Sequence, residues 1–124
     1  MNDSLQAAMA GLAVALDAPR PQGAQLGVWR FTVRQRLGTV RDGLAAEHPQ
    51  ARAGWAVARE RAVLRERQRL LTRLAIISPR ILDAPEPEGI RTEIKRLLHD
   101  IDRHRQRMQD VTWDEAEVDF GGSE

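Results

Sequence analysis

Large hydrophobic residues recur along this chain at spacings of three and four residues, the repeat of a helix that is buried on one side. Strands would instead alternate apolar and polar positions, and runs of β-branched residues are absent. Four such segments are separated by short stretches rich in proline and glycine, which favour turns. These stretches are APRPQG at 18–23, EHPQARAG at 47–54 and DAPEPEG at 83–89.

The first segment, residues 2–17, has one stripe of large apolar residues at spacings of four, three and four. Its opposite side is mostly alanine, so the predicted helix is apolar nearly all round. Such a helix is either the central element of a bundle or covers a neighbouring molecule with its outer face. The stripe consists of Leu5, Met9, Leu12 and Leu16.

The second segment, residues 25–47, combines an apolar stripe with three glycines. Gly27, Gly38 and Gly43 each weaken a helix by up to about 1 kcal/mol relative to alanine. Close approach by a neighbouring helix would compensate for that cost. The stripe consists of Leu26, Val33, Leu37, Val40 and Leu44.

The third and fourth segments carry the most regular repeats. In the third, apolar pairs recur every seven residues from Ala56 to Ile77, and Pro79 is predicted to end or kink the helix. The fourth alternates steps of four and three residues without a break, and a histidine occupies one position of this seam. Its members are Ile90, Ile94, Leu97, Ile101, His104, Met108 and Val111.

Four amphipathic helices joined by loops of a few residues predict an all-α fold, an antiparallel up-down-up-down four-helix bundle. We expect the bundle to span residues 1–112, with a short acidic C-terminal tail at 113–124. The tail is compatible with both helical and extended conformations until Gly121 and Gly122 stop a helix. A chain of 124 residues is long enough to bury one core.

The composition suits a reducing compartment. It contains no cysteine, which excludes disulfides, thiolate metal sites and cysteine nucleophiles. The uncharged segment from Ser4 to Leu16 lacks a preceding basic region, and it is shorter than the roughly 20 residues that cross a bilayer. We therefore expect a cytoplasmic protein that does not bind membranes.

Charge is distributed unevenly although the net charge is only +1. Residues 49–82 hold eight arginines and two glutamates, whereas residues 111–124 hold five acids and no base. Four of the arginines recur every four residues and form one row along the third helix. The row could face water, an acidic protein surface or the chain's own tail, or the phosphates of a nucleic acid. It consists of Arg61, Arg65, Arg69 and Arg73.

Catalytic, cofactor and metal motifs are absent from the sequence. None of the serines lies in a nucleophile elbow, there is no tyrosine, and no glycine-rich phosphate loop precedes a helix. His99 and His104 are five residues apart, so they cannot ligate one metal from the same helical face. We predict no enzyme, cofactor, metal site or small-molecule substrate. We interpret His104 as a core histidine bonded to a neighbouring helix, with a role in specificity or pH sensing as the alternative.

The last residues, HDIDRHRQRMQDVTWDEAEVDFGGSE at 99–124, are similar to the ends of short uncharacterised actinobacterial helical proteins that finish in Gly-Gly-Ser-Glu. The resemblance implies no particular activity. It agrees with 18 arginines against one lysine, a composition typical of a GC-rich bacterial genome.

These features predict a non-catalytic module for protein–protein interaction or self-association. The stripe Leu5, Met9, Leu12 and Leu16 is expected to supply an apolar contact surface. The tail alternates acids with bulky apolar residues, as short docking segments do, so it is expected to form a second contact. Its anchors would be Trp113, Val118 and Phe120. The alternative is a nucleic-acid-associated regulator that uses the arginine row.

Overall fold

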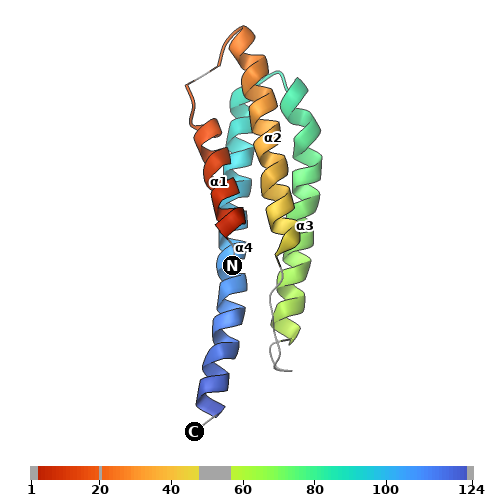
Figure 1. The fold of residues 1–124 in the computed structure, drawn as a ribbon. Helices are drawn as coiled ribbons and strands as arrows, with labels where there is room; N and C mark the ends of the chain where they lie inside the picture. The colour runs from red at the N-terminus through yellow and green to blue at the C-terminus, as the bar shows by residue number, and fades with distance from the viewer. Residues whose placement is uncertain (1–2, 20, 48–56, 123–124) are drawn as a thin grey trace.

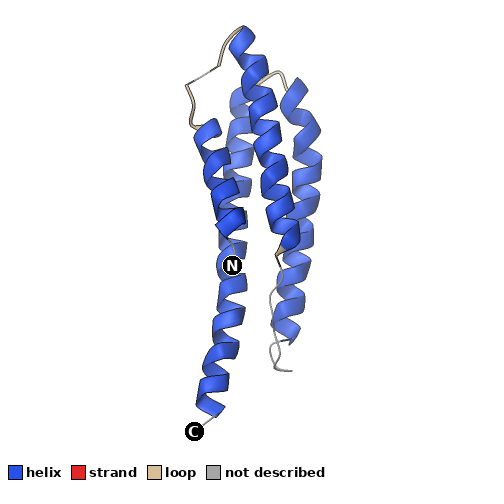
Figure 2. Cartoon of the chain, in the orientation of Figure 1, coloured by secondary structure: helices blue, strands red, loops and turns tan. Residues whose placement is uncertain are grey.

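The computed structural model consists of four α-helices connected by loops (Figure 2). It describes residues 3–19, 21–47 and 57–122, with side chains described up to residue 110, and these ranges contain no strand. The all-α, four-helix prediction is therefore confirmed. The helices are α1 (Asp3–Leu16), α2 (Ala24–Ala46), α3 (Val57–Asp83) and α4 (Pro87–Gly122).

Neighbouring helices run in opposite directions. Along α1 and α2, Ala15 contacts Trp29 and Gly11 contacts Arg36, so later residues of α1 meet earlier residues of α2. Contacts between α2 and α3 and between α3 and α4 follow the same rule. Each helix packs against the next, and α1 also packs against α4 (Figure 1).

The core lies along the centre of the bundle and is built from the apolar stripes of all four helices. In α3 and α4 these are the residues that recur every seven positions, because only one face of each helix points inward. Fully buried members include Leu12, Leu16, Leu37, Leu44, Leu74, Ile81, Ile94, Leu97 and Ile101.

The C-terminal end of α1 is held by side chains from two other helices. The indole Nε1 of Trp29 donates to the carbonyl of Ala15 at 3.0 Å. Arg91 donates to the carbonyls of Leu16 and Ala18, and its guanidinium lies 5.5 Å from the centre of the Trp29 ring. These contacts satisfy carbonyls that a helix end leaves without partners, so they fix the short α1 against α2 and α4.

The prediction that the large residues of α1 form an exposed contact surface is wrong. Leu5, Leu12 and Leu16 are fully buried, and the partly buried Met9 packs against the same core. Burying a large aliphatic side chain contributes more free energy than burying an alanine. The leucine stripe therefore faces inward and the alanine side faces out. The large apolar residue that α1 exposes is Val14, at 68%.

Of the two effects predicted for Pro79, an end of the helix or a kink, the structure excludes the first. Helix α3 continues through the proline to Asp83, although an interior proline costs about 3 kcal/mol of helix stability. Two interactions beyond the proline offset this cost. Ile81 is buried in the core, and Arg30 of α2 donates to the carbonyl of Ile81 at 3.2 Å.

Residues 113–122 belong to α4 and do not form a separate segment. The helix continues to Gly122 and projects past the ends of the other helices (Figure 1). A boundary at residue 112 is therefore not visible in the backbone. The side chains of Trp113, Val118 and Phe120 lie outside the described residues, so their role as anchors stays a prediction.

Close helix approach accounts for one of the three glycines of α2. A Cβ added at Gly43 would lie 3.2 Å from the Cα of Leu5, whereas one added at Gly38 would meet nothing within 4 Å. We expect Gly38→Ala to stabilise the fold by about 0.5–1 kcal/mol, because alanine restricts the unfolded chain and favours helix.

The matched substitution Gly43→Ala is expected to give a chain no more stable than the unchanged one, since α1 would have to move away. Urea denaturation followed by circular dichroism measures both. Equal gains from the two substitutions would contradict the close approach of α1 and α2.

Among the described residues, no helix is both long enough and apolar enough to cross a membrane.

Candidate functional site

Three ion pairs connect α3 and α4 at regular intervals of seven residues on each helix. We call them the ladder. Two of the pairs are joined by two hydrogen bonds each, and the middle pair by one at 2.8 Å. The pairs are Glu66 with Arg107, Arg73 with Asp100, and Arg80 with Glu93.

Glu66 also binds the buried histidine of the seam. Its Oε1 lies 2.7 Å from Nδ1 of His104, and the Nε and Nη2 groups of Arg107 donate to the two carboxylate oxygens at 3.0 and 2.6 Å. His104 is 0% exposed, and no described residue bonds its Nε2. The prediction of a core histidine bonded to a neighbouring helix is confirmed.

The pKa of each partner is shifted by this arrangement. Burial lowers the pKa of His104, and the hydrogen bond that its Nδ1 donates to Glu66 opposes this shift without overcoming it. Burial raises the pKa of Glu66, but hydrogen bonds and charge from Arg107 and His104 bring it below its ordinary value. At neutral pH His104 is therefore neutral and Glu66 is ionised, and the Nδ1–H group of His104 donates a hydrogen bond to the carboxylate.

We expect acidification to destabilise the fold through His104. Below pH 6.5 the unfolded histidine takes up a proton that the folded one does not, so stability falls as the pH falls. One proton corresponds to at most about 1.4 kcal/mol per pH unit. Below pH 4.5 the stabilising ionisation of Glu66 is lost as well, when the pH passes through its lowered folded-state pKa.

The test is the free energy of unfolding at about pH 7 and about pH 5 for the unchanged chain and for His104→Asn, which does not titrate. The asparagine variant should show the shallower dependence on pH. Burial raises the pKa of Glu47, which acts in the opposite direction, but this contribution is common to both chains. Parallel curves would contradict the assignment to His104.

The surface above the ladder is strongly cationic. Three hollows of about 430, 240 and 450 Å³ follow the line between α3 and α4, and Arg73 lines all three. We call this surface the basic face. Its acids are Glu66, Glu93 and Asp100, and all three are ladder members. Its cations are Arg69, Arg73, Arg80, Lys95, Arg96, Arg103 and Arg107.

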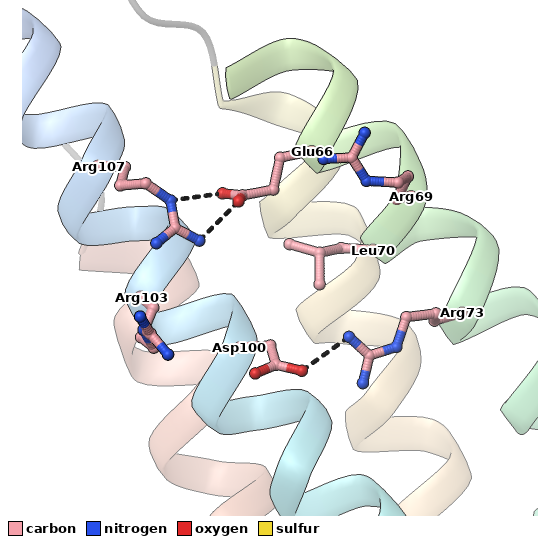
Figure 3. Close-up of a pocket in the computed structure, with 7 residues that line it drawn as sticks. All are labelled: Glu66, Arg69, Leu70, Arg73, Asp100, Arg103 and Arg107. Atoms are coloured by element: carbon pink, nitrogen blue, oxygen red, sulfur yellow. Dashed lines mark hydrogen bonds and ion pairs between the residues drawn. The ribbon is translucent and has the colours of Figure 1, made fainter. Parts of the chain in front are cut away.

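Three of these cations take no part in the ion pairs and hydrogen bonds among the described residues. The ladder neutralises three arginines, and Lys95 pairs with Asp17 at 2.8 Å. Within the described part of the chain, Arg69, Arg96 and Arg103 have no hydrogen-bond or ion-pair partner. Figure 3 shows Arg69 and Arg103 on opposite helices beside two of the ladder pairs. Among the described residues, the basic face therefore presents three guanidinium groups that have no partner, and all three side chains are exposed.

One large apolar side chain lies among these charges. Ile76 is 60% exposed and lines the same hollow as Arg73, Arg80 and Arg96. Among the described residues, no phenylalanine, tyrosine or tryptophan lines the three hollows of the basic face, and His99 lines one of them. The surface thus offers cationic and aliphatic contacts together.

The predicted arginine row is only partly on this face. Four residues correspond to slightly more than one helical turn, so the row rotates by about 40° at each step. Arg69 and Arg73 reach the basic face, whereas Arg61 and Arg65 are exposed nearer the start of α3. Arg96 and Arg103 of α4 were not predicted as site residues from the sequence. The feature of the sequence that could have indicated them is their spacing of seven residues, which is also the interval between successive ladder pairs.

A further hollow, of about 670 Å³, lies between α1 and α2 and is largely apolar. Val14 and Val28 line it, and each is 68% exposed. Its lining also includes Ala15, Ala18 and the buried Trp29. We call it the apolar hollow. The exposed apolar surface to which α1 contributes is therefore this hollow, and not the leucine stripe that the sequence predicted.

Comparison of the chain with protein-family models, with curated proteins and with solved structures gave no match. The resemblance to actinobacterial proteins therefore stays a prediction. Among the described residues, no three histidine, aspartate or glutamate side chains gather in a group that could hold a metal ion.

Proposed function

We propose that the chain is a non-catalytic protein-interaction module whose basic face binds an acidic, partly apolar protein segment. The observation that carries this proposal is the combination of unpaired Arg69, Arg96 and Arg103 with the exposed Ile76 on one face. Guanidinium groups bind carboxylates in a planar, two-bond geometry, and the isoleucine would bury against an apolar side chain of the partner.

A nucleic acid is the second candidate ligand. Arg96 and Arg103 lie about 10 Å apart along α4, a spacing from which two guanidinium groups could contact separate phosphates of one strand. A nucleic acid would make no use of Ile76, and the described residues of the face include no tryptophan, tyrosine or phenylalanine on which bases could stack. These points favour a protein ligand.

The apolar hollow is a second contact area in this proposal. Its exposed valines are suited to a partner's apolar side chains, or to those of another copy of the chain. This keeps a role for α1 in binding, with Val14 in place of the buried leucines.

Fluorescence anisotropy tests the basic face. The probes are a short labelled peptide in which acids alternate with leucine, unrelated in sequence to this chain, and a labelled single-stranded oligonucleotide. Arg96→Glu with Arg103→Glu should weaken peptide binding by about tenfold or more. The matched control is Arg34→Glu with Arg41→Glu on the exposed side of α2, which should change binding little.

The variant Ile76→Ser separates the two ligands. It should weaken binding of the peptide and leave binding of the oligonucleotide unchanged. If the oligonucleotide binds alone, with a double-logarithmic salt slope of about −2 for three arginine contacts, the nucleic-acid candidate replaces the protein ligand. Absence of peptide binding at low salt would refute the proposal.

A further inference from the structure

We propose that the acidic segment bound by the basic face is residues 111–124 of a second copy of this chain, a segment that includes the C-terminal end of α4. The inference rests on the proposed function of that face and names its partner. It makes the protein a self-associating module held by reciprocal contacts.

Composition matches this segment to the basic face. Residues 111–124 contain five acids, no base, and the apolar residues Val111, Trp113, Val118 and Phe120. The face offers three arginines that have no partner among the described residues, and one of them, Arg96, lines the same hollow as the exposed Ile76. Both surfaces therefore have an excess of one charge and an apolar component, which is the complementarity that a specific polar interface requires.

The geometry of α4 requires that the two surfaces come from different copies. The helix is continuous from Pro87 to Gly122, so residue 114 lies about 16 Å along the axis from Arg103 and about 27 Å from Arg96. A continuous helix cannot fold back onto a face that it helps to form. Because the end of α4 projects beyond the bundle, it is accessible to another molecule (Figure 1).

A two-fold arrangement lets both contacts form at once. Each copy carries one acidic end and one basic face, so two copies with antiparallel α4 helices can place each end on the other's face. The interface is then closed, with two identical contacts and no unpaired end. The expected assembly is a dimer whose stability decreases with salt, because exposed charges are screened.

Sedimentation velocity of the full chain tests this assembly. We expect a dimer at low ionic strength and dissociation as salt is added. Asp114→Arg with Glu117→Arg should give a monomer, and so should Arg96→Glu with Arg103→Glu. The chain that carries all four changes reverses both charges of the contact and should form a dimer again. Circular dichroism verifies that each variant keeps the helical fold.

A monomeric unchanged chain at low salt would overturn the inference. A dimer that persists in the Asp114→Arg, Glu117→Arg variant would also overturn it. If Val14→Glu dissociates that dimer, the copies associate through the apolar hollow and not through the basic face.

A labelled peptide of residues 111–124 separates this failure from failure of the proposed function. If the unrelated acidic peptide binds the basic face and this one does not, the inference falls and the function stands. If neither binds, both fall.

Discussion

Replacing Leu12 with glutamate is expected to unfold the bundle at room temperature or bring it close to unfolding. Leu12 is 0% exposed and lies in the main core with residues of the other helices. Losing a buried leucine costs about 2–5 kcal/mol, and burying a carboxylate without a partner adds several more. Domains of this size are stable by only about 5–15 kcal/mol. Urea denaturation followed by circular dichroism gives the loss directly.

Val14→Glu is the matched control, two residues further along the same helix. Val14 is 68% exposed, so the same change in charge should alter the free energy of unfolding by no more than about 0.5 kcal/mol. If Leu12→Glu were as stable as Val14→Glu, α1 would not be part of the core. The leucine stripe would then again be a candidate contact surface.

The sequence predicted α3 and α4 well because their buried residues recur strictly. Val63, Leu70 and Ile77 lie seven residues apart, and all three are buried in the structure. The charged residues between them cannot enter a core without partners, so only one face of the helix is free to point inward. Regular amphipathicity determines both the helix and its orientation.

Helix α1 was harder because alanine is compatible with both the core and the surface. A helix that is apolar all round does not indicate which side faces inward. Which side faces inward depends on the space left between α2 and α4. The sequence of α1 alone carries no information about that space. The continuation of α3 past Pro79 has a similar cause, since the burial of Ile81 depends on tertiary packing.

The candidate site was predicted in part for the same reason. Spacing within one helix is visible in a sequence, so the arginine row of α3 was found. Pairing between helices depends on their register, which the short connection from Asp83 to Pro87 sets. The ladder and the unpaired Arg96 and Arg103 become recognisable once α3 and α4 are aligned.

Replacing Glu66 with alanine is expected to destabilise the fold by about 2–4 kcal/mol. The fully buried His104 would lose the partner of its Nδ1 while its Nε2 already has none among the described residues. Arg107 would lose both of its hydrogen bonds to the carboxylate. A buried polar group left without a partner costs more than the net gain from forming the bond.

Glu93→Ala is the matched control because Glu93 also belongs to the ladder and accepts two hydrogen bonds, from Arg80. Its side chain is 41% exposed against 24% for Glu66, and it contacts no buried histidine. Exposed ion pairs contribute at most about 1 kcal/mol, so this variant should lose little. The variant that combines Glu66→Ala with His104→Leu should recover part of the loss, since no buried polar group then lacks a partner. Equal losses for Glu66→Ala and Glu93→Ala would show that the histidine contributes nothing, and that the ladder acts as three equivalent surface pairs.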